Sequence, residues 1–488
     1  MKKSVESPFG WPKKLAPDIS LKNKPFPYNE PVHTLLISTY DLGRQPFGLA
    51  SPAAWLRAAG VEVTCVDASR DRVADEQLAT AGLIAFYLPM HTATRLAAPL
   101  ITRARQINPS ARLCAYGLYA PLNADWLREH GVHEVLGPEA EAELVALARA
   151  DGVGAMSGTS IPRLTFITPD RMALPPLHRY AALRMADGSR RVSGSTDATR
   201  GCKHLCRHCP IVPVYNGQFR VVPVDVVIDD IRAQVAAGAQ HISFGDPDFL
   251  NGPTHARRIV ERMAATFPGL TYDVTIKVEH LLAHGEMLPL LRDTGCLYVT
   301  SAVESVDDEV LAKLRKGHTR ADVIEATARC RAAGLTLIPT FIPFMPWTTL
   351  DGYVDLLEFV EDLGLVEHVA PVQLAIRLLV TANSALLELP DIRSAIGSFD
   401  GASLIYPWEH ADPRVDALQA RIMALVGDEA TVPRGVLFDT LVAMAREAAG
   451  RPRIAVPARD GVPVPGGTEP WYCCAEPTPQ QLGVTQDS

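Results

Sequence analysis

The sequence lacks the features that mark secreted and membrane-spanning proteins. The positively charged first residues have no apolar core behind them, as a secretory signal would require. No apolar run approaches the roughly 20 residues that span a bilayer. The nine cysteines are an odd number, which argues against a disulfide framework and favours metal binding or catalysis. We therefore expect a cytoplasmic protein.

An excess of positive charge is also missing. The chain has 47 Lys and Arg against 55 Asp and Glu, and its formal net charge is −8. This balance argues against bulk binding to nucleic acid or to an anionic membrane, so we expect neither partner. Internal repeats and extended low-complexity segments are absent too. The composition is that of an ordinary globular protein, and 488 residues predict two to four domains.

Alternating strands and helices predict two α/β domains. Residues 31–150 fit a doubly wound, Rossmann-type parallel sheet, whose ligands bind at the carboxyl ends of the strands. Residues 151–190 form a connector or an ordered embellishment of a neighbouring domain. About six strand–helix units in residues 191–384 predict a partial (β/α)6 TIM barrel, because a complete barrel needs eight. Residues 1–30 form an irregular extension, and residues 385–488 form a helical region with a tail rich in Pro and Gly.

Three clustered cysteines predict a metal site. Cys202, Cys206 and Cys209 have the spacing Cys-x3-Cys-x2-Cys. Three thiolates on one loop can bind three irons of a cubane cluster, because soft sulfur ligands select iron–sulfur or zinc. The fourth iron then stays open for chelation by an amine and a carboxylate. The alternative is a structural zinc loop with His204 or His208 as fourth ligand, although no second ligand pair follows at the usual zinc spacing.

This loop, after the first strand of a six-unit partial barrel, resembles the radical S-adenosylmethionine (radical SAM) superfamily over about residues 191–380. The resemblance implies that the three cysteines ligate a 4Fe-4S cluster and that S-adenosylmethionine (SAM) chelates its fourth iron. One electron, from a donor such as flavodoxin or ferredoxin, then breaks a carbon–sulfur bond. The residue before the third cysteine often packs near the adenine. In this chain that residue is His208.

Polar residues at other strand ends resemble the SAM-binding positions of the superfamily. Asp246 and Asp248 follow the second strand, where the methionine amino group is often held, and a turn with an Asp cap is the alternative. Glu304 ends the fourth strand and resembles the position near the ribose hydroxyls. The remaining candidates are Lys277, Glu279 and Arg377. For each of them the alternative is a salt bridge within the barrel.

The N-terminal domain resembles the cobalamin-binding domains that precede many radical SAM barrels. The order of its segments and the sequence GPEAE at 137–141 match that arrangement. The Asp-x-His-x-x-Gly loop that supplies an axial histidine is absent, so we favour a domain that keeps the fold without the cofactor. Cobalamin stays an alternative. His91 is a candidate ligand, although a loop histidine more often makes a hydrogen bond.

The adjacent Cys473 and Cys474 near the C-terminus can hold a soft electrophile such as trivalent arsenic, act as a redox dithiol, or form a surface disulfide. The sequence WYCCAEP resembles the tail of the CUAEP/CCAEP-tail radical SAM proteins, and this similarity extends over nearly the full length. Within that family the chain resembles the members of arsinothricin biosynthesis, an antibiotic pathway. The resemblance implies a transferase in which these two cysteines hold arsenite while it receives the 3-amino-3-carboxypropyl group of SAM.

Two other functions stay open at this point. The first is an enzyme that generates a 5′-deoxyadenosyl radical, with or without cobalamin, and uses it to modify a small molecule. The second is a zinc-stabilised, non-catalytic protein that binds a metalloid.

Overall fold

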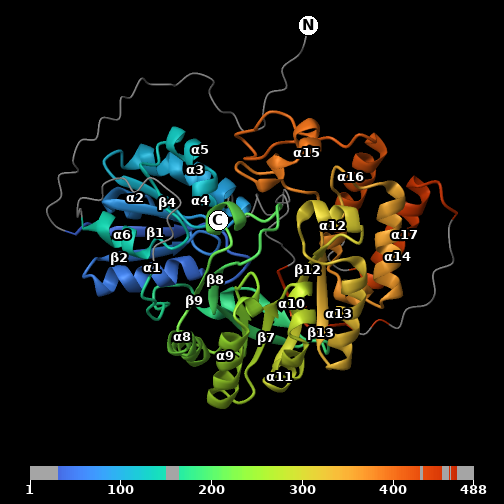
Figure 1. Ribbon diagram of the computed structural model, residues 1–488. Helices are drawn as coiled ribbons and strands as arrows, with labels where there is room; N and C mark the ends of the chain where they lie inside the picture. The colour runs from blue at the N-terminus through green and yellow to red at the C-terminus, as the bar shows by residue number, and fades with distance from the viewer. Residues whose placement is uncertain (1–30, 150–163, 429–431, 453–460, 462, 470–488) are drawn as a thin grey trace, which may run out of the picture.

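The structure is a computed structural model that describes residues 31–149, 164–428, 432–452, 461 and 463–469. The predicted extension at residues 1–30 and the tail cysteines Cys473 and Cys474 lie outside the described residues. Two α/β bodies lie side by side (Figure 1), and the segment that follows the barrel also contacts the first body, where Asn383 donates to the Leu122 carbonyl at 3.1 Å. None of the helices in these ranges is long and apolar enough to cross a membrane.

The first body is a parallel five-stranded sheet with the strand order β2-β1-β3-β4-β5. This order and the helices on both faces confirm the doubly wound domain. Leu35 and Ile37 of β1 belong to one hydrophobic cluster and Leu36 to another, because successive side chains of a strand point to opposite faces. The strands are β1 (Thr34–Ser38), β2 (Val63–Asp67), β3 (Leu83–Tyr87), β4 (Arg112–Tyr116) and β5 (Glu134–Val135). The helices are α1 (Phe47–Ala58), α2 (Asp75–Thr80), α3 (His91–Ile107), α4 (Tyr119–Leu122), α5 (Ala124–Glu129) and α6 (Glu141–Ala148).

The second body is built on a seven-stranded sheet with the order β13-β12-β11-β10-β7-β6-β14. Five of its strands are parallel, and β6 and β14 are antiparallel additions at one edge. The strands are β6 (Ala182–Arg184), β7 (Arg190–Thr196), β10 (His241–Phe244), β11 (Thr271–Thr275), β12 (Cys296–Glu304), β13 (Thr336–Phe341) and β14 (Gly466–Gly467). This sheet confirms the partial barrel, and β6 lies within the expected connector.

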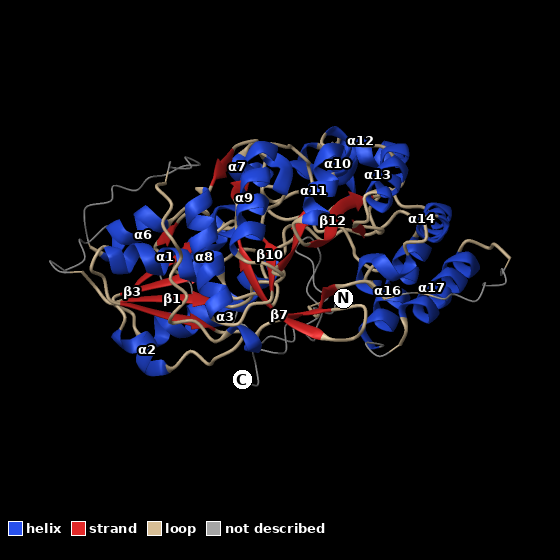
Figure 2. Ribbon diagram, turned by 90° about the horizontal axis from the view of Figure 1, so that it is seen from below, coloured by secondary structure: helices blue, strands red, loops and turns tan. Residues whose placement is uncertain are grey.

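Helices follow the parallel strands and cover the outer side of the sheet (Figures 1 and 2). They are α8 (Val224–Ala236), α9 (Pro253–Thr266), α10 (Val278–Ala283), α11 (Leu288–Asp293), α12 (Asp308–Leu314), α13 (Arg320–Ala332) and α14 (Leu350–Asp362). Short 3-10 turns lie between some of these elements, at η2 (Phe249–Asn251), η3 (Gly285–Met287) and η4 (Val366–His368).

The sixth barrel strand differs from the expectation. Its segment begins as a 3-10 turn, η5 (Pro371–Leu374), and then pairs with the sheet only through a bridge between Phe344 and Arg377. The side chain of Gln373 accepts the N–H of Phe341 at 2.9 Å, so a side chain stands where a ladder partner would be. After this segment the chain continues through η6 (Ala385–Glu388), α15 (Pro390–Ala395), α16 (Pro413–Asp428) and α17 (Arg434–Ala448). A further 3-10 turn, η1 (Leu177–Arg179), precedes β6.

Candidate functional site

The cysteine loop is held by a small hairpin and by one asparagine. It lies between β8 (Thr199–Gly201) and α7 (Val212–Tyr215), and β8 pairs with β9 (Phe219–Val221). Gly201 has φ +79°, and a Cβ there would lie 2.4 Å from the Tyr215 ring, so glycine is required directly before the first cysteine. Asn251 accepts the N–H of Lys203 at 3.3 Å and donates to the Gly201 carbonyl at 3.4 Å. These contacts fix the start of the loop.

The three thiols of the loop are largely shielded from solvent. Cys202 and Cys206 are buried, Cys209 is half-buried, and none of them forms a disulfide with another described cysteine. Within the described ranges, the three donors grouped closely enough to hold one metal ion belong to His204, Asp248 and His280, and the cysteines are not among them. Three thiolates on one loop can serve as ligands to several irons.

A buried lysine lies beside two of these thiols. Burial alone would lower the pKa of Lys316, but Glu304 and the thiolates of Cys206 and Cys209 raise it. Lys316 is thus a fixed cation that favours the deprotonated thiol, the form that binds metal. The sequence did not single out Lys316, because no motif surrounds it and only the fold brings it to the loop.

Glu304 lies between a histidine and a lysine. Its Oε1 lies 3.1 Å from Nε2 of His208 and 3.4 Å from Nζ of Lys316, and all three side chains are buried. Burial would raise the pKa of Glu304, but Lys316 and His208 lower it to about 2, so the carboxylate stays ionised. Glu304 has φ +69°, a left-handed conformation that is costly for a non-glycine residue and that occurs where the register of β12 shifts.

His208 also lines a small pocket of about 10 Å³ between the two domains. The pocket joins a helix of the N-terminal domain to the cysteine loop and to the end of β13, and the other lining residues are mainly apolar. They are Tyr119, Pro210, Ile342, Leu378, Leu379 and Thr381. A pocket of this size holds about one water molecule, so the expected packing of His208 near an adenine stays a prediction.

The two aspartates after β10 have different environments. Asp246 accepts from the N–H of Ala198 at 2.9 Å and from the hydroxyl of Thr199 at 2.5 Å, so it supports the backbone that leads into β8. Burial and the neighbouring Asp197 raise the pKa of Asp246 to about 7. Oδ1 of Asp248 caps η2 by accepting the N–H of Leu250 at 3.2 Å. Asp246 therefore has mainly a structural environment, and Asp248 combines a cap with a free carboxylate oxygen.

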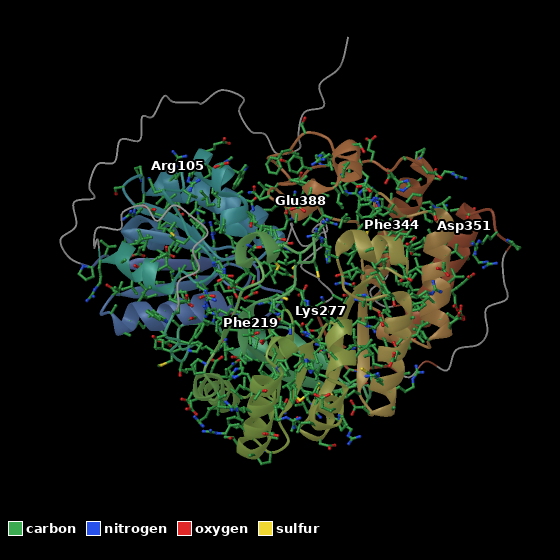
Figure 3. All side chains as sticks on the ribbon, in the orientation of Figure 1. Arg105, Phe219, Lys277, Phe344, Asp351 and Glu388 are labelled. Carbon is green, nitrogen blue, oxygen red and sulfur yellow. The ribbon has the colours of Figure 1, made fainter. Side chains whose placement is uncertain are left out.

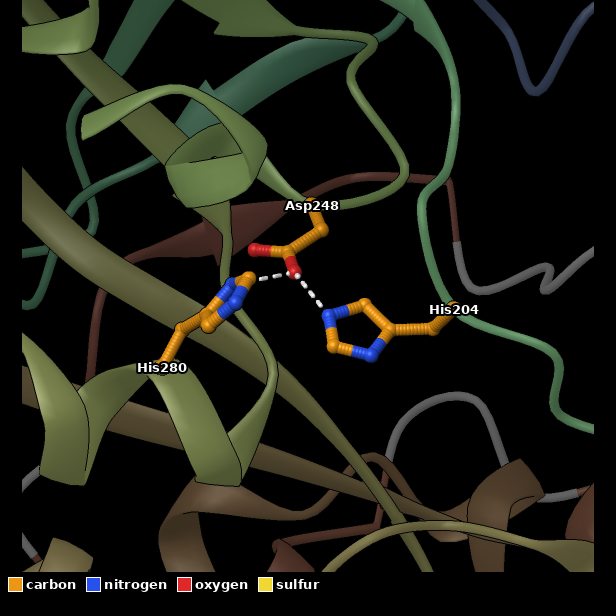
Figure 4. A group of neighbouring side chains, drawn as sticks. All are labelled: His204, Asp248 and His280. Carbon is orange, nitrogen blue, oxygen red and sulfur yellow. Dashed lines mark ion pairs between the residues drawn. The ribbon is translucent and has the colours of Figure 1, made fainter. Parts of the chain in front are cut away.

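That second oxygen of Asp248 faces two histidines (Figure 4). Oδ2 lies 2.6 Å from Nδ1 of His280 and 3.5 Å from Nε2 of His204. Burial would raise the pKa of Asp248, but the two histidines lower it to about 2. Nζ of Lys277 pairs with Oε2 of Glu279 at 3.3 Å, and Lys277 lies near the middle of the molecule (Figure 3). His280, which the sequence analysis missed, follows Lys277 by three residues.

Arg377 pairs with the C-terminal region. Its guanidinium donates to Oδ1 of Asp416 at 2.6 Å and to the carbonyl of Trp408, and it stacks on the Trp408 ring at 3.7 Å. Arg377 therefore forms a salt bridge, and its partner Asp416 lies in the C-terminal region, outside the barrel.

His91 makes a hydrogen bond in the structure. Its Nε2 lies 2.7 Å from the carbonyl oxygen of Ser403. Burial lowers the pKa of His91 to about 4, so the ring is neutral at physiological pH and Nε2–H is the donor. The contact joins the first turn of α3 to the C-terminal region.

The N-terminal domain is tied directly to the strand before the cysteine loop. Nη1 of Arg200 donates to Oε1 of Glu141 at 2.7 Å, and Nη2 donates to the Ser51 hydroxyl at 3.2 Å. Ser51 also donates to Glu141 at 2.7 Å. Glu141 belongs to the GPEAE segment singled out in the sequence, and it faces the barrel here.

The comparisons with known proteins agree with this geometry. The family model of the Radical SAM superfamily matches residues 197–360. This segment is a radical SAM domain. The three cysteines, Asp248, Lys277 and Glu304 all lie in the radical SAM domain, and the family implies a 4Fe-4S cluster and SAM.

Curated relatives match mainly this radical SAM domain. The ribosomal protein uS12 methylthiotransferase RimO of Parabacteroides distasonis is 26% identical over 210 residues, which is 40% of this chain and 44% of the relative. The bacteriochlorophyllide d C-12(1)-methyltransferase of Chlorobaculum tepidum is 30% identical over 132 residues, 26% of this chain and 28% of the relative. The chain thus spans less than half the length of these relatives.

Two solved structures share the arrangement of both domains. The cobalamin-dependent radical SAM enzyme OxsB, with aqua-cobalamin and SAM bound, has a TM-score of 0.64 and 13% identity, covering 82% of this chain and 67% of OxsB. The radical SAM methyltransferase TsrM from Kitasatospora setae, with cobalamin and a 4Fe-4S cluster bound, has a TM-score of 0.54 and 17% identity. That match covers 68% of this chain and 70% of TsrM. At these identities the likeness shows the fold alone.

Proposed function

We propose that this protein is a radical SAM transferase that moves the 3-amino-3-carboxypropyl group of SAM to trivalent arsenic. The observation that carries the SAM chemistry is the three-thiol loop of Cys202, Cys206 and Cys209, with Lys316 beside it. When bound, a 4Fe-4S cluster supplies the electron that breaks a carbon–sulfur bond of SAM. An external donor such as flavodoxin or ferredoxin provides that electron.

The chain's own residues hold and orient SAM. His208 offers an imidazole face to the adenine. Glu304 stays ionised beside Lys316 and accepts hydrogen bonds from the ribose hydroxyls.

The acceptor is assigned from the tail. Cys473 and Cys474 are two adjacent soft donors, which suit trivalent arsenic as substrate, and their surroundings resemble the CCAEP tails of the arsinothricin-type enzymes. In this reaction one electron breaks the bond between sulfur and Cγ, methylthioadenosine leaves with the electron pair on sulfur, and the carbon radical adds to arsenic. A second electron from the same external donor and loss of hydroxide then give the trivalent organoarsenical with its new carbon–arsenic bond. The product is a precursor of an arsenic-containing antibiotic.

A second candidate is a 5′-deoxyadenosyl-radical enzyme that uses cobalamin to modify a small molecule. The strand order of the N-terminal sheet and the likeness to OxsB and TsrM favour it. His91, the candidate axial ligand, makes another contact, however. Its Nε2 lies 2.7 Å from the carbonyl oxygen of Ser403. We therefore keep cobalamin with this second candidate only.

The fate of SAM tests the proposal. Reconstituted protein is incubated without oxygen with SAM, dithionite and arsenite, and the products are separated by mass spectrometry. Methylthioadenosine together with an organoarsenical supports the proposed transfer. Formation of 5′-deoxyadenosine, or a corrinoid spectrum in the purified protein, favours the second candidate instead. A colourless protein with stoichiometric zinc on the cysteine loop would contradict both.

A further inference from the structure

Three side chains from separate segments converge beside the cysteine loop (Figure 4). His204 lies within the loop, Asp248 follows β10, and His280 lies in the first turn of α10 after β11. One donor atom from each lies within 4.8 Å of the other two. Asp248 is fully buried and His280 nearly so, and the side chain of His204 is 14% exposed. The group is therefore shielded from bulk water.

The facing atoms lack satisfied hydrogen bonds. Nε2 of His204, Oδ2 of Asp248 and Nδ1 of His280 are each buried without a partner in hydrogen-bonding geometry among the described residues. They nevertheless approach one another as ion pairs at 2.6 and 3.5 Å. Buried polar atoms left in this way cost free energy, and a shared cation removes the cost.

A neighbouring carboxylate selects the ligating nitrogen of His204. Oε2 of Glu279 lies 3.5 Å from Nδ1 of His204, on the opposite side of the ring from Asp248. In the tautomer that carries its proton on Nδ1, His204 directs its N–H toward Glu279, and the lone pair of Nε2 points toward the carboxylate of Asp248. Two electron-rich atoms then face each other. Metal-binding histidines are commonly oriented by this arrangement, in which the second ring nitrogen donates to a carboxylate.

We propose that His204, Asp248 and His280 form a site for one divalent first-row transition metal ion, with zinc as the reference ion. Two imidazoles and one carboxylate suit zinc, iron, manganese or cobalt, and three protein ligands leave a coordination position open for a substrate oxygen or water. Glu279 is the positioning residue for His204. The site takes His204 from the cysteine loop but uses none of the three cysteines, and it does not depend on which bond of SAM is cleaved.

Elemental analysis of the cluster-loaded protein tests the site. The chelator-treated holoenzyme receives one equivalent of zinc chloride, is desalted without oxygen, and is measured for iron and zinc per chain. We expect about one zinc beside about four irons. D248N and H280Q should retain the iron and bind zinc at least tenfold more weakly, and E279Q should weaken zinc binding by about 10- to 100-fold.

The neighbouring His284 supplies the matched control. Its ring lies 5.5 Å from that of His280, and it is outside the three-residue group. H284Q should bind zinc as the wild type does. Iron content and far-UV circular dichroism identify variants that fail to fold, and either of D248N and H280Q suffices for the comparison.

Two results would overturn the site. One is a holoenzyme with full iron that retains no zinc. The other is zinc that is retained equally by D248N and H280Q. If the wild type holds no zinc while D248N loses affinity for SAM, the carboxylate serves the methionine amine instead. Because zinc content is measured without turnover, these results are distinct from a failure of the proposed transfer reaction.

Discussion

Nη1 of Arg200 donates to Oε1 of Glu141 at 2.7 Å, and this buried ion pair joins the two domains two residues before the first cysteine of the loop. The guanidinium also stacks on Phe47 and Phe166 at 5.2 and 5.0 Å. The N-terminal domain therefore does more than precede the barrel, because one of its carboxylates anchors the strand that presents the thiols.

Removing the charge of Glu141 should loosen this anchor. E141Q leaves the buried guanidinium without its counter-charge, which costs about 3–5 kcal/mol in comparable pairs. We expect a lower melting temperature and less iron per chain after reconstitution. E143Q on the same helix is the control, since Glu143 is half-buried and outside this pair. An E141Q protein that matches E143Q in both measurements would show that the anchor is unimportant.

Each cysteine of the loop should be required for the cluster. Replacing Cys202, Cys206 or Cys209 by alanine removes a thiolate that no described neighbour can replace, since the nearby histidines face carboxylates. We expect loss of the visible iron–sulfur absorption and of SAM cleavage, with an unchanged far-UV spectrum. C65A is the control, because Cys65 is a free thiol in the N-terminal sheet. Full iron content in a loop variant would contradict the assignment.

The tail cysteines should affect the acceptor and spare the cluster. In the proposed reaction, serine at 473 or 474 removes a soft arsenic ligand and leaves the three loop thiols in place. We expect the wild-type iron content and SAM affinity, with at least a tenfold loss of organoarsenical product. Liquid chromatography with arsenic-specific detection measures the product. Normal product yield from the double serine variant would remove the basis for arsenic as the acceptor.

His91 should make stability depend on pH in the mildly acidic range. Burial lowers the pKa of His91 from 6.5 to about 4 in the folded protein. The unfolded chain therefore takes up a proton first as the pH falls, and the stabilisation present above 6.5 is lost as the pH falls through about 4. Between about pH 7 and pH 5 the wild type should lose about 2 kcal/mol more than H91Q.

Urea denaturation of both proteins at the two pH values measures this difference. Groups other than His91 titrate in both proteins and cancel in the comparison. Equal losses in the wild type and in H91Q would mean that His91 is not held neutral by burial.

Much of the fold follows from local patterns. The alternation of strands and helices in the barrel was expected, because apolar periodicity and entry prolines such as Pro223 are local signals. The irregular form of the sixth strand was not expected. The side chain of Gln373 takes the place of a backbone hydrogen-bond partner of Phe341, and this contact leaves no periodic signal in the sequence.

The sequence by itself identified the three thiols as candidate cluster ligands, because Cys202, Cys206 and Cys209 lie within eight residues and their spacing sets what one loop can bind. It also placed Asp248, Lys277 and Glu304 at strand ends. Only the tertiary structure decided which of these groups meet. Glu304 lies 3.1 Å from His208, 96 residues away in sequence, because the carboxyl ends of parallel strands meet at one edge of the sheet. Arg200 donates to Glu141, 59 residues away, because the N-terminal domain packs against the hairpin of β8 and β9. Lys316 and His280 also reach the site only through the fold.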